Sequence, residues 1–154
     1  MNDATKLACT VDALFGEGVS SCIPPDVRFT HSRRGRIRGA FHGDDLLCTL
    51  RIDGGLALTP HFAQMLLAHP AFQESCVEVS GEAAPFVREG RSVFARHVVR
   101  CGERVGVSAD TPVTHEGTVI AVGRAVLSAE MMAGCDRGVA VRIRNGLKNS
   151  PSHT

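Results

Sequence analysis

The sequence predicts an α+β protein: a small α+β domain over residues 1–72, then a mostly-β pseudo-barrel over residues 73–148. Apolar residues recur at helical spacing in only a few short segments, whereas many other segments alternate apolar and polar residues as strands do. Clusters of Gly, Pro and Asp separate these segments at short intervals. The chain of 154 residues, 44% of them hydrophobic, is long enough to bury a core. We expect residues 149–154 to form a disordered tail.

Two helices are predicted in the first domain. The first has a polar start and is expected to end at Gly16, where glycine favours a stop. The second begins with Thr59 as its cap and Pro60 in its first turn, and it ends at Pro70. The apolar face of the first helix consists of Leu7, Val11, Leu14 and Phe15.

Three strands are predicted between these helices. From Pro25 onward the apolar period changes to two, in the segments VRFT, RIRGAFH and LLCTLRI. The turn formers Arg34-Gly35 and Gly43-Asp44 separate these segments. Short turns between alternating segments predict a three-stranded antiparallel sheet.

Short strands dominate the second domain. CVEVS, SVFARHVVRC, TVIAVGRAVL and GVAVRIR read as strands, while EAAPFVREG and SAEMMAG read as brief helices, the latter with a serine cap. Many short strands with two brief helices predict a small, partly open barrel. Pro112 falls inside another strand candidate, DTPVTH. Because proline cannot donate a hydrogen bond to a neighbouring strand, we expect this strand to be short or to lie at an edge.

Composition and motifs exclude several classes of function. No apolar run approaches the roughly 20 residues that span a bilayer, and the amino terminus lacks a signal-peptide pattern, so we expect a cytoplasmic protein without a membrane partner. The six cysteines show no metal-ligand spacing and are expected to be buried, reduced thiols. No nucleophile, phosphate-loop or metalloprotease motif occurs, so neither a cofactor, a metal site nor catalytic residues are expected.

Two pairs of neighbouring residues are candidates for an acid–base couple. Arg96 and His97 are neighbours on a predicted strand, where adjacent side chains point to opposite faces. Asp44 and Asp45 belong to a predicted turn. Neither pair supports catalysis, and we expect that the chain is not an enzyme.

Positive charge is local rather than global. The net charge is only +1, yet five arginines and no acidic residue lie between Arg28 and Arg38, and four cations and no carboxylate lie between Arg137 and Lys148. Guanidinium groups suit phosphate recognition, although a GC-rich genome produces the same arginine bias. For Arg33, Arg34, Arg36 and Arg38, a solvated turn and a second phosphate-contacting surface remain open alternatives.

Several segments carry a resemblance to a known family. EAAPFVREGRSVFARHVV, VGRAVLSAEMM and RGVAVRIRNG resemble the PUA domain, a small RNA-binding barrel attached to many RNA-modifying enzymes. The version at the carboxyl end of archaeal tRNA-guanine transglycosylases, the archaeosine enzymes, is most similar. Upstream, LFGEG, PPDVRF, SRRGRIR, LLCTLR and GLALTPHFAQMLL resemble the small domain that precedes the PUA domain there. The resemblance covers roughly Val11 to Leu147, and the catalytic domain of that family is absent.

This resemblance implies where RNA would bind. A glycine turn at Gly90 would expose backbone amides to phosphates, whereas the plain alternative is a helix cap with solvated arginines. In PUA domains this loop contacts the acceptor end of RNA, and the last strand lines the same groove. The implied RNA-binding residues are Arg88, Gly90, Arg91 and Ser92 in the loop, and Arg137, Gly138, Arg142 and Arg144 on the strand, with Lys148 as an extension.

The resulting expectation is a non-catalytic RNA-binding protein that binds structured RNA, tRNA in particular, in tRNA modification or related RNA metabolism. The chain has no Trp or Tyr. This scarcity of aromatic side chains argues against binding that depends on stacking the bases of an unpaired RNA strand on aromatic rings. Five phenylalanines are predicted to lie in the core: Phe15, Phe29, Phe41, Phe62 and Phe94. One alternative is a detached carboxyl-terminal subunit of a split transglycosylase with a separate catalytic partner. Another is a PUA fold kept as a scaffold without RNA.

Overall fold

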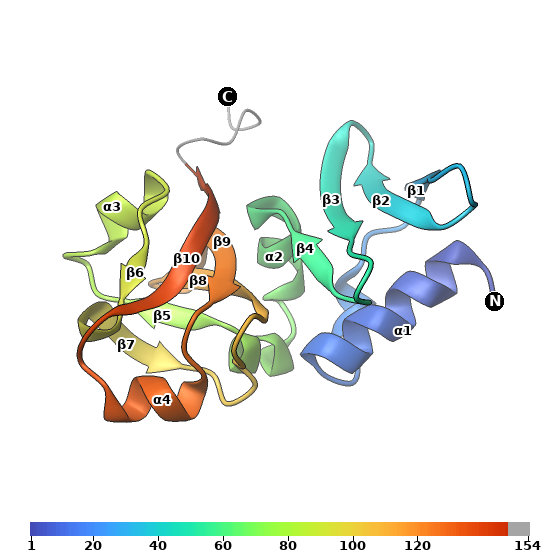
Figure 1. The fold of residues 1–154 in the computed structure, drawn as a ribbon. Coiled ribbons are helices and arrows are strands. Elements are labelled where there is room, and N and C mark those ends of the chain that lie inside the picture. Colours follow the sequence, from blue (N-terminus) through green and yellow to red (C-terminus); the bar gives the residue numbers. More distant parts are fainter. Residues whose placement is uncertain (148–154) are drawn as a thin grey trace. The chain divides into compact units, whose positions relative to one another are not determined.

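The computed structural model describes residues 1–147 and divides into two compact units. Unit 1 is Met1–Phe72, and unit 2 begins at Gln73. Figure 1 shows a mixed sheet-and-helix arrangement in each. Lys148 and the predicted tail 149–154 lie outside the described residues.

Unit 1 begins with helix α1 (Asp3–Phe15), as predicted. The Asn2 side chain caps it by accepting a 2.8 Å hydrogen bond from the Thr5 backbone N–H. The helix ends at Gly16, whose N–H donates to the carbonyl oxygen of Asp12. Three of the four predicted face residues, Leu7, Val11 and Phe15, are buried, whereas Leu14 is 39% exposed.

A four-stranded antiparallel sheet follows in unit 1. Its order is β1 (Val27–His31), β2 (Ile37–His42), β3 (Asp45–Leu50) and β4 (Leu56–Leu58). The prediction of three strands missed β4 because three residues are too few to establish a period. Both leucines of β4 are buried in the unit.

Helix α2 (Pro60–Leu66) covers the end of β3 and is capped as predicted. The Thr59 hydroxyl accepts a 3.2 Å hydrogen bond from the Phe62 N–H. The helix ends at Leu66, earlier than the predicted stop at Pro70. The short 3-10 helices η1 (Val19–Cys22) and η2 (Pro70–Ser75) complete the helical segments of this region.

Unit 2 is a six-stranded sheet that curls into a nearly closed barrel, which confirms the predicted fold class. The strand order is β6-β10-β9-β8-β5-β7. Its two edge strands are joined by only three residues, the 3-10 helix η3 (Ala95–His97), so the edges must lie near each other. The strands are β5 (Val77–Val79), β6 (Val93–Phe94), β7 (Val98–Cys101), β8 (Asp110–His115), β9 (Thr118–Ala125) and β10 (Val139–Gly146).

Two short helices pack on this barrel, and both were predicted. Helix α3 is Ala84–Arg88, and helix α4 is Ala129–Gly134. The Ser128 side chain caps α4 by accepting a 3.2 Å hydrogen bond from the Met131 N–H. Most of the core consists of small β-branched and alanine side chains, which allow a tightly curled sheet to close around a narrow interior.

The expectation that the proline-containing strand is short or at an edge is wrong. Strand β8 has six residues and pairs with β9 on one side and β5 on the other. Pro112 lies opposite Val122 of β9, but pairing with β5 involves only Val113 and Thr114. The proline therefore precedes the segment that is paired on both sides, and the ladder to β5 does not need its missing N–H.

Burial divides the six cysteines, each of which is a free thiol. Cys48 and Cys76 are buried as expected, but Cys9 and Cys135 are exposed. Burial raises the pKa of the Cys76 thiol to about 12, so this group stays protonated at ordinary pH. Among the described residues, no helix is long and apolar enough to cross a membrane.

These environments predict selective alkylation. Iodoacetamide at pH 8 should modify Cys9 and Cys135 rapidly and leave Cys76 unmodified until the protein unfolds, because only an accessible thiolate reacts. Peptide mass spectrometry over a time course checks this. Modification of Cys76 in the native protein at the rate of Cys9 would contradict the assigned burial.

Candidate functional site

The glycine turn after α3 is a helix cap. Gly90 has φ +100°, a left-handed conformation that glycine adopts without strain. Its N–H donates to the Val87 carbonyl at 2.9 Å, and the Arg91 N–H donates to the Phe86 carbonyl at 3.1 Å. This pattern of two nested hydrogen bonds is the Schellman motif.

The cap corrects one part of the sequence interpretation. The backbone amides of Gly90 and Arg91 were expected to be exposed to phosphates, but both are already bonded to carbonyls of α3. These two amides are therefore not available to bind an anion. Arg91 is exposed and Arg88 and Ser92 are half-buried, so the loop presents two guanidinium groups and one hydroxyl.

A cavity of about 260 Å³ lies beside this loop in unit 2. Arg91 is at one wall, with its guanidinium carbon 5.9 Å from the centre of the Phe86 ring. The carboxylate of Glu82 is the single acidic group among the lining residues. The full lining is Glu82, Ala83, Phe86, Val87, Arg91, Ser92, Phe94, Arg96 and His97.

Two phenylalanines that line the cavity are exposed. Phe94, which was predicted to be a core residue, is 45% exposed, and Phe86 is 53% exposed. Arg96 lies over the Phe94 ring at 5.7 Å, which makes a second guanidinium–phenyl pair. The alternation of side chains along the strand could have indicated this exposure. Val93 and Ala95 on either side of Phe94 are buried, so Phe94 points to the outer face.

The expectation for His97 also changes. Arg96 and His97 do not point to opposite faces of a strand, because both lie in η3, where the backbone turns. Arg96 Nε donates a 3.3 Å hydrogen bond to His97 Nε2. This contact brings both side chains to the cavity and orients the guanidinium near Phe94.

Strand β10 connects this cavity with the rest of the predicted site. At its start, the Gly138 carbonyl accepts a 2.9 Å hydrogen bond from the Ala95 N–H, and Val139 is paired with Phe94. At its end, a Cβ on Gly146 would overlap the Arg88 carbonyl. The structure therefore brings the end of β10 to the loop Arg88–Ser92, which holds predicted RNA-binding residues, whereas the start of β10 lies beside Phe94 and Ala95.

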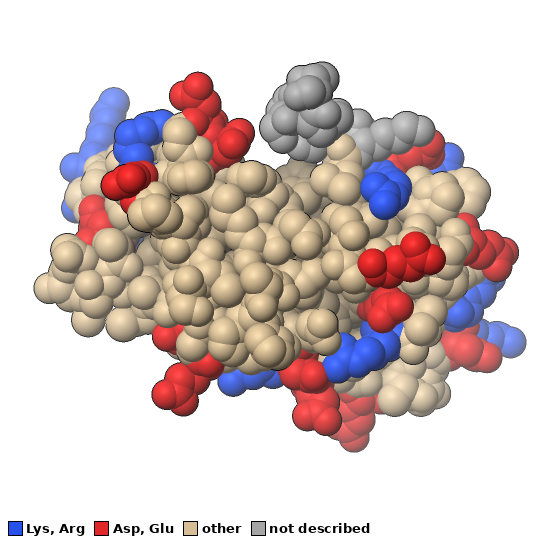
Figure 2. Space-filling model, turned by 180° about the vertical axis from the view of Figure 1, so that it is seen from behind, with Lys and Arg blue, Asp and Glu red and all other residues tan. Residues whose placement is uncertain are grey.

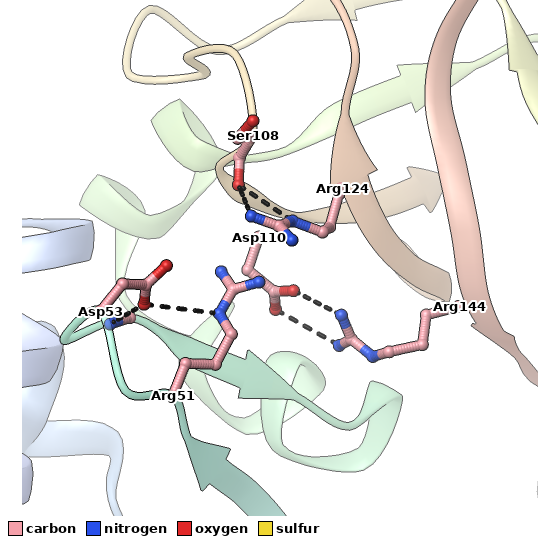
Figure 3. A network of polar contacts seen from close by, with 7 residues as sticks. Arg51, Asp53, Ser108, Asp110, Arg124 and Arg144 are labelled. Carbon is pink, nitrogen blue, oxygen red and sulfur yellow. Dashed lines mark hydrogen bonds and ion pairs between the residues drawn. The ribbon is translucent and has the colours of Figure 1, made fainter.

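The middle of β10 has a different environment. Arg144 donates to the carboxylate of Asp110 on β8 at 2.6 and 3.4 Å, and the Asp110 side chain is only 3% exposed (Figure 3). This contact gives Arg144 a structural role in the barrel. Its predicted contact with RNA stays a prediction.

Arg142 is exposed and lies directly opposite Arg124 of β9. Figure 3 shows the Arg124 guanidinium turned to the Ser108 carbonyl, to which it donates two hydrogen bonds of 3.3 and 3.2 Å. Like charges opposite each other on neighbouring strands repel, and a bound anion would relieve that repulsion. Arg124 was not identified from the sequence because its cross-strand partner cannot be read from the chain order.

Other charges of unit 2 are paired internally. Arg100 donates a 2.7 Å hydrogen bond to Glu74, whose other carboxylate oxygen accepts from the Glu103 N–H at 3.1 Å. The hydrogen bond from the Glu103 N–H is the largest cause of a lowered pKa of Glu74. Arg100 lowers this pKa further, and partial burial acts in the opposite direction. In Figure 2, basic side chains occur in small groups among acidic ones, so the visible face shows no continuous basic surface on either unit. Within residues 1–147 no cluster of His, Cys, Asp or Glu could hold a metal ion.

Comparison with known proteins agrees with this geometry. The family model for the PUA domain matches residues 76–147, which is nearly all of the described part of unit 2. The chain is a PUA-domain protein. The model for the patch-forming domain C2 of tRNA-guanine transglycosylase matches residues 10–71, which lie in unit 1.

The PUA-domain protein is similar in sequence to several enzymes of one name. It is 33% identical over 150 residues to a tRNA-guanine(15) transglycosylase of Methanothermobacter thermautotrophicus, covering 95% of this chain and 23% of that enzyme. It is 34% identical over 151 residues to the enzyme of the same name from Thermoplasma volcanium, covering 96% of this chain and 24% of that enzyme. The chain thus spans about a quarter of the length of these relatives, and both of its matched domains fall within the aligned part.

A solved structure shares the fold of the whole PUA-domain protein. A hypothetical protein of Pyrococcus horikoshii superposes with a TM-score of 0.76 at 18% identity, covering 96% of this chain and 92% of that one. The likeness shows that the same two-part fold occurs in another protein.

The Arg144–Asp110 contact predicts a sharp difference between two arginines on one strand. Arg144→Met removes two charge-assisted hydrogen bonds from a buried carboxylate and should lower the free energy of unfolding by about 2 kcal/mol. Arg142→Met removes an exposed guanidinium from the same strand and should change it by less than about 0.5 kcal/mol. Urea denaturation measures both, and equal effects would contradict the structural role of Arg144.

Proposed function

We propose that this protein is a non-catalytic RNA-binding protein that binds the acceptor region of tRNA through the cavity and loop of its PUA domain. The observation that carries the proposal is the pair of guanidinium–phenyl contacts, Arg91 with Phe86 and Arg96 with Phe94, on the walls of one cavity. The PUA match and the relatives among tRNA-modifying enzymes support RNA as the ligand.

The chemistry of these walls fits the end of a folded RNA. Exposed phenyl rings offer stacking surfaces to an unpaired base, and guanidinium groups offer charge and hydrogen bonds to the phosphates beside it. The acceptor region of tRNA presents both features, because a base-paired stem adjoins a single-stranded end. The exposed phenylalanines therefore revise the expectation of recognition without aromatic stacking.

Charge balance supports binding through a few local contacts. The net charge is +1, and acidic residues are distributed among the basic ones, so general attraction to a polyanion is weak. In this proposal, Arg88, Arg91, Arg137 and Arg142 contact phosphates, Ser92 donates its hydroxyl, and Gly138 lets the backbone approach closely. Gly90 fixes the shape of the loop through its cap. Arg144 supports the strand, and its own contact with RNA is the least supported.

Replacing Arg88 and Arg91 together by Ala should weaken binding of a tRNA transcript by about 1–3 kcal/mol and make the dependence on salt shallower. Fluorescence anisotropy at several salt concentrations measures both quantities. Arg33→Ala with Arg38→Ala removes the same charge from the other unit and serves as the matched control. Equal losses in the two double variants, with unchanged thermal unfolding, would remove the loop from the proposal.

A second candidate function rests on the extent of the match to the relatives. The chain corresponds to only 23% of the Methanothermobacter enzyme, so a separate catalytic subunit could supply the transglycosylase part. In that case the chain would deliver tRNA to its partner. Affinity purification from the native cell tests this candidate: a stoichiometric transglycosylase-like protein supports it, and recovery of the chain with tRNA alone contradicts it.

A further inference from the structure

Unit 1 contains a cavity of about 460 Å³ whose walls come from three separate segments. Lys6 and Thr10 line it from one face of α1, where they are one turn apart. Arg34 and Arg36 line it from the turn between β1 and β2, and Arg51 lines it from the end of β3. The lining residues include four cations and no carboxylate.

Two acidic residues, Asp53 and Asp3, lie close in sequence to residues that line the cavity. Asp53 accepts a 2.9 Å hydrogen bond from the Gly55 N–H and lies 3.9 Å from Arg51 Nε, so it offsets part of the charge of that arginine (Figure 3). Asp3 on α1 is 2.7 Å from His31 Nε2. Neither carboxylate belongs to the lining, and the charges of Lys6, Arg34 and Arg36 are not offset within it.

The arginine-bearing turn does not depend on its arginine side chains. The Ser32 N–H donates to the Arg36 carbonyl at 2.8 Å, and the Gly35 N–H donates to the Ser32 carbonyl at 2.9 Å. The Ser32 hydroxyl accepts from the Arg36 N–H at 3.2 Å. Gly35 has φ +82°, so the turn shape is set by backbone and serine. The guanidinium groups at Arg34 and Arg36 are thus held at the cavity by a turn that would form without them.

We propose that this cavity is a second phosphate-binding site, which accepts a backbone phosphate of the same RNA that the PUA domain binds. The inference rests on the proposed RNA-binding function and adds a contact in unit 1. Lys6, Arg34 and Arg36 surround one opening, and a phosphate group has several oxygens that can accept hydrogen bonds from them. A guanidinium group can donate two parallel hydrogen bonds to a phosphate. Of the two alternatives for the basic segment, a phosphate-contacting surface is therefore favoured for Arg34 and Arg36.

The same segment provides a matched control. Arg33 and Arg38 are exposed and adjoin Arg34 and Arg36 in sequence, but neither lines the cavity. Arg34→Ala with Arg36→Ala and Arg33→Ala with Arg38→Ala therefore change the net charge equally within one hairpin. Both variants should unfold thermally like the wild type, because the turn is held by backbone and Ser32 contacts.

The test is titration of an unmodified tRNA transcript into the full chain at several salt concentrations. The cavity variant should bind about tenfold more weakly, with a salt slope shallower by about one, while the control stays within about twofold of wild type. Equal weakening in both hairpin variants, or none in the cavity variant, would overturn the inference.

The loop variant, Arg88→Ala with Arg91→Ala, separates this inference from the proposed function. If the loop variant weakens binding and the cavity variant does not, the second site is wrong and the PUA site remains. If both weaken binding, combining them should multiply the two losses, because independent contacts are additive in free energy. Absence of tRNA binding by the wild-type chain would contradict both proposals.

Discussion

The contact between Gly146 and the end of α3 is the constraint on which the PUA site depends. Because a side chain at Gly146 would overlap the Arg88 carbonyl, the last residue of β10 can lie there only as glycine. That approach holds the capped turn at Gly90 against the end of β10, while the start of β10 pairs with β6 beside the cavity. One strand thus fixes the position of the loop and of the aromatic cavity within a single rigid barrel.

Most of the fold could be predicted from the sequence, because caps and alternation are local signals. The Thr59 and Ser128 caps and the alternation in β9 and β10 indicated the elements correctly. Strand β4 was missed since three residues establish no period, and β8 was misplaced since strand order depends on pairing between distant segments. Proline cannot donate a hydrogen bond to a neighbouring strand, but the pairing of β8 with β5 begins at Val113, just after Pro112. The proline therefore does not restrict β8 to an edge.

The site was less accessible to sequence reasoning, for a physical reason. The pairing of Arg144 with Asp110 and the placement of Arg124 opposite Arg142 are products of strand register. Arginine count alone therefore cannot separate side chains that stabilise the barrel from those that face a ligand. The structure makes that distinction through partners: Arg100, Arg124 and Arg144 contact protein oxygens, whereas Arg91 and Arg96 lie over exposed rings.

The most direct test of the central claim is an NMR titration of the full chain with a minihelix that carries the tRNA acceptor stem and its single-stranded end. Backbone amide shifts should change most at residues 86–97 and at the start and end of β10. Changes confined to β8 and the turn that follows it, which line no part of the cavity, or no changes at all, would contradict this site.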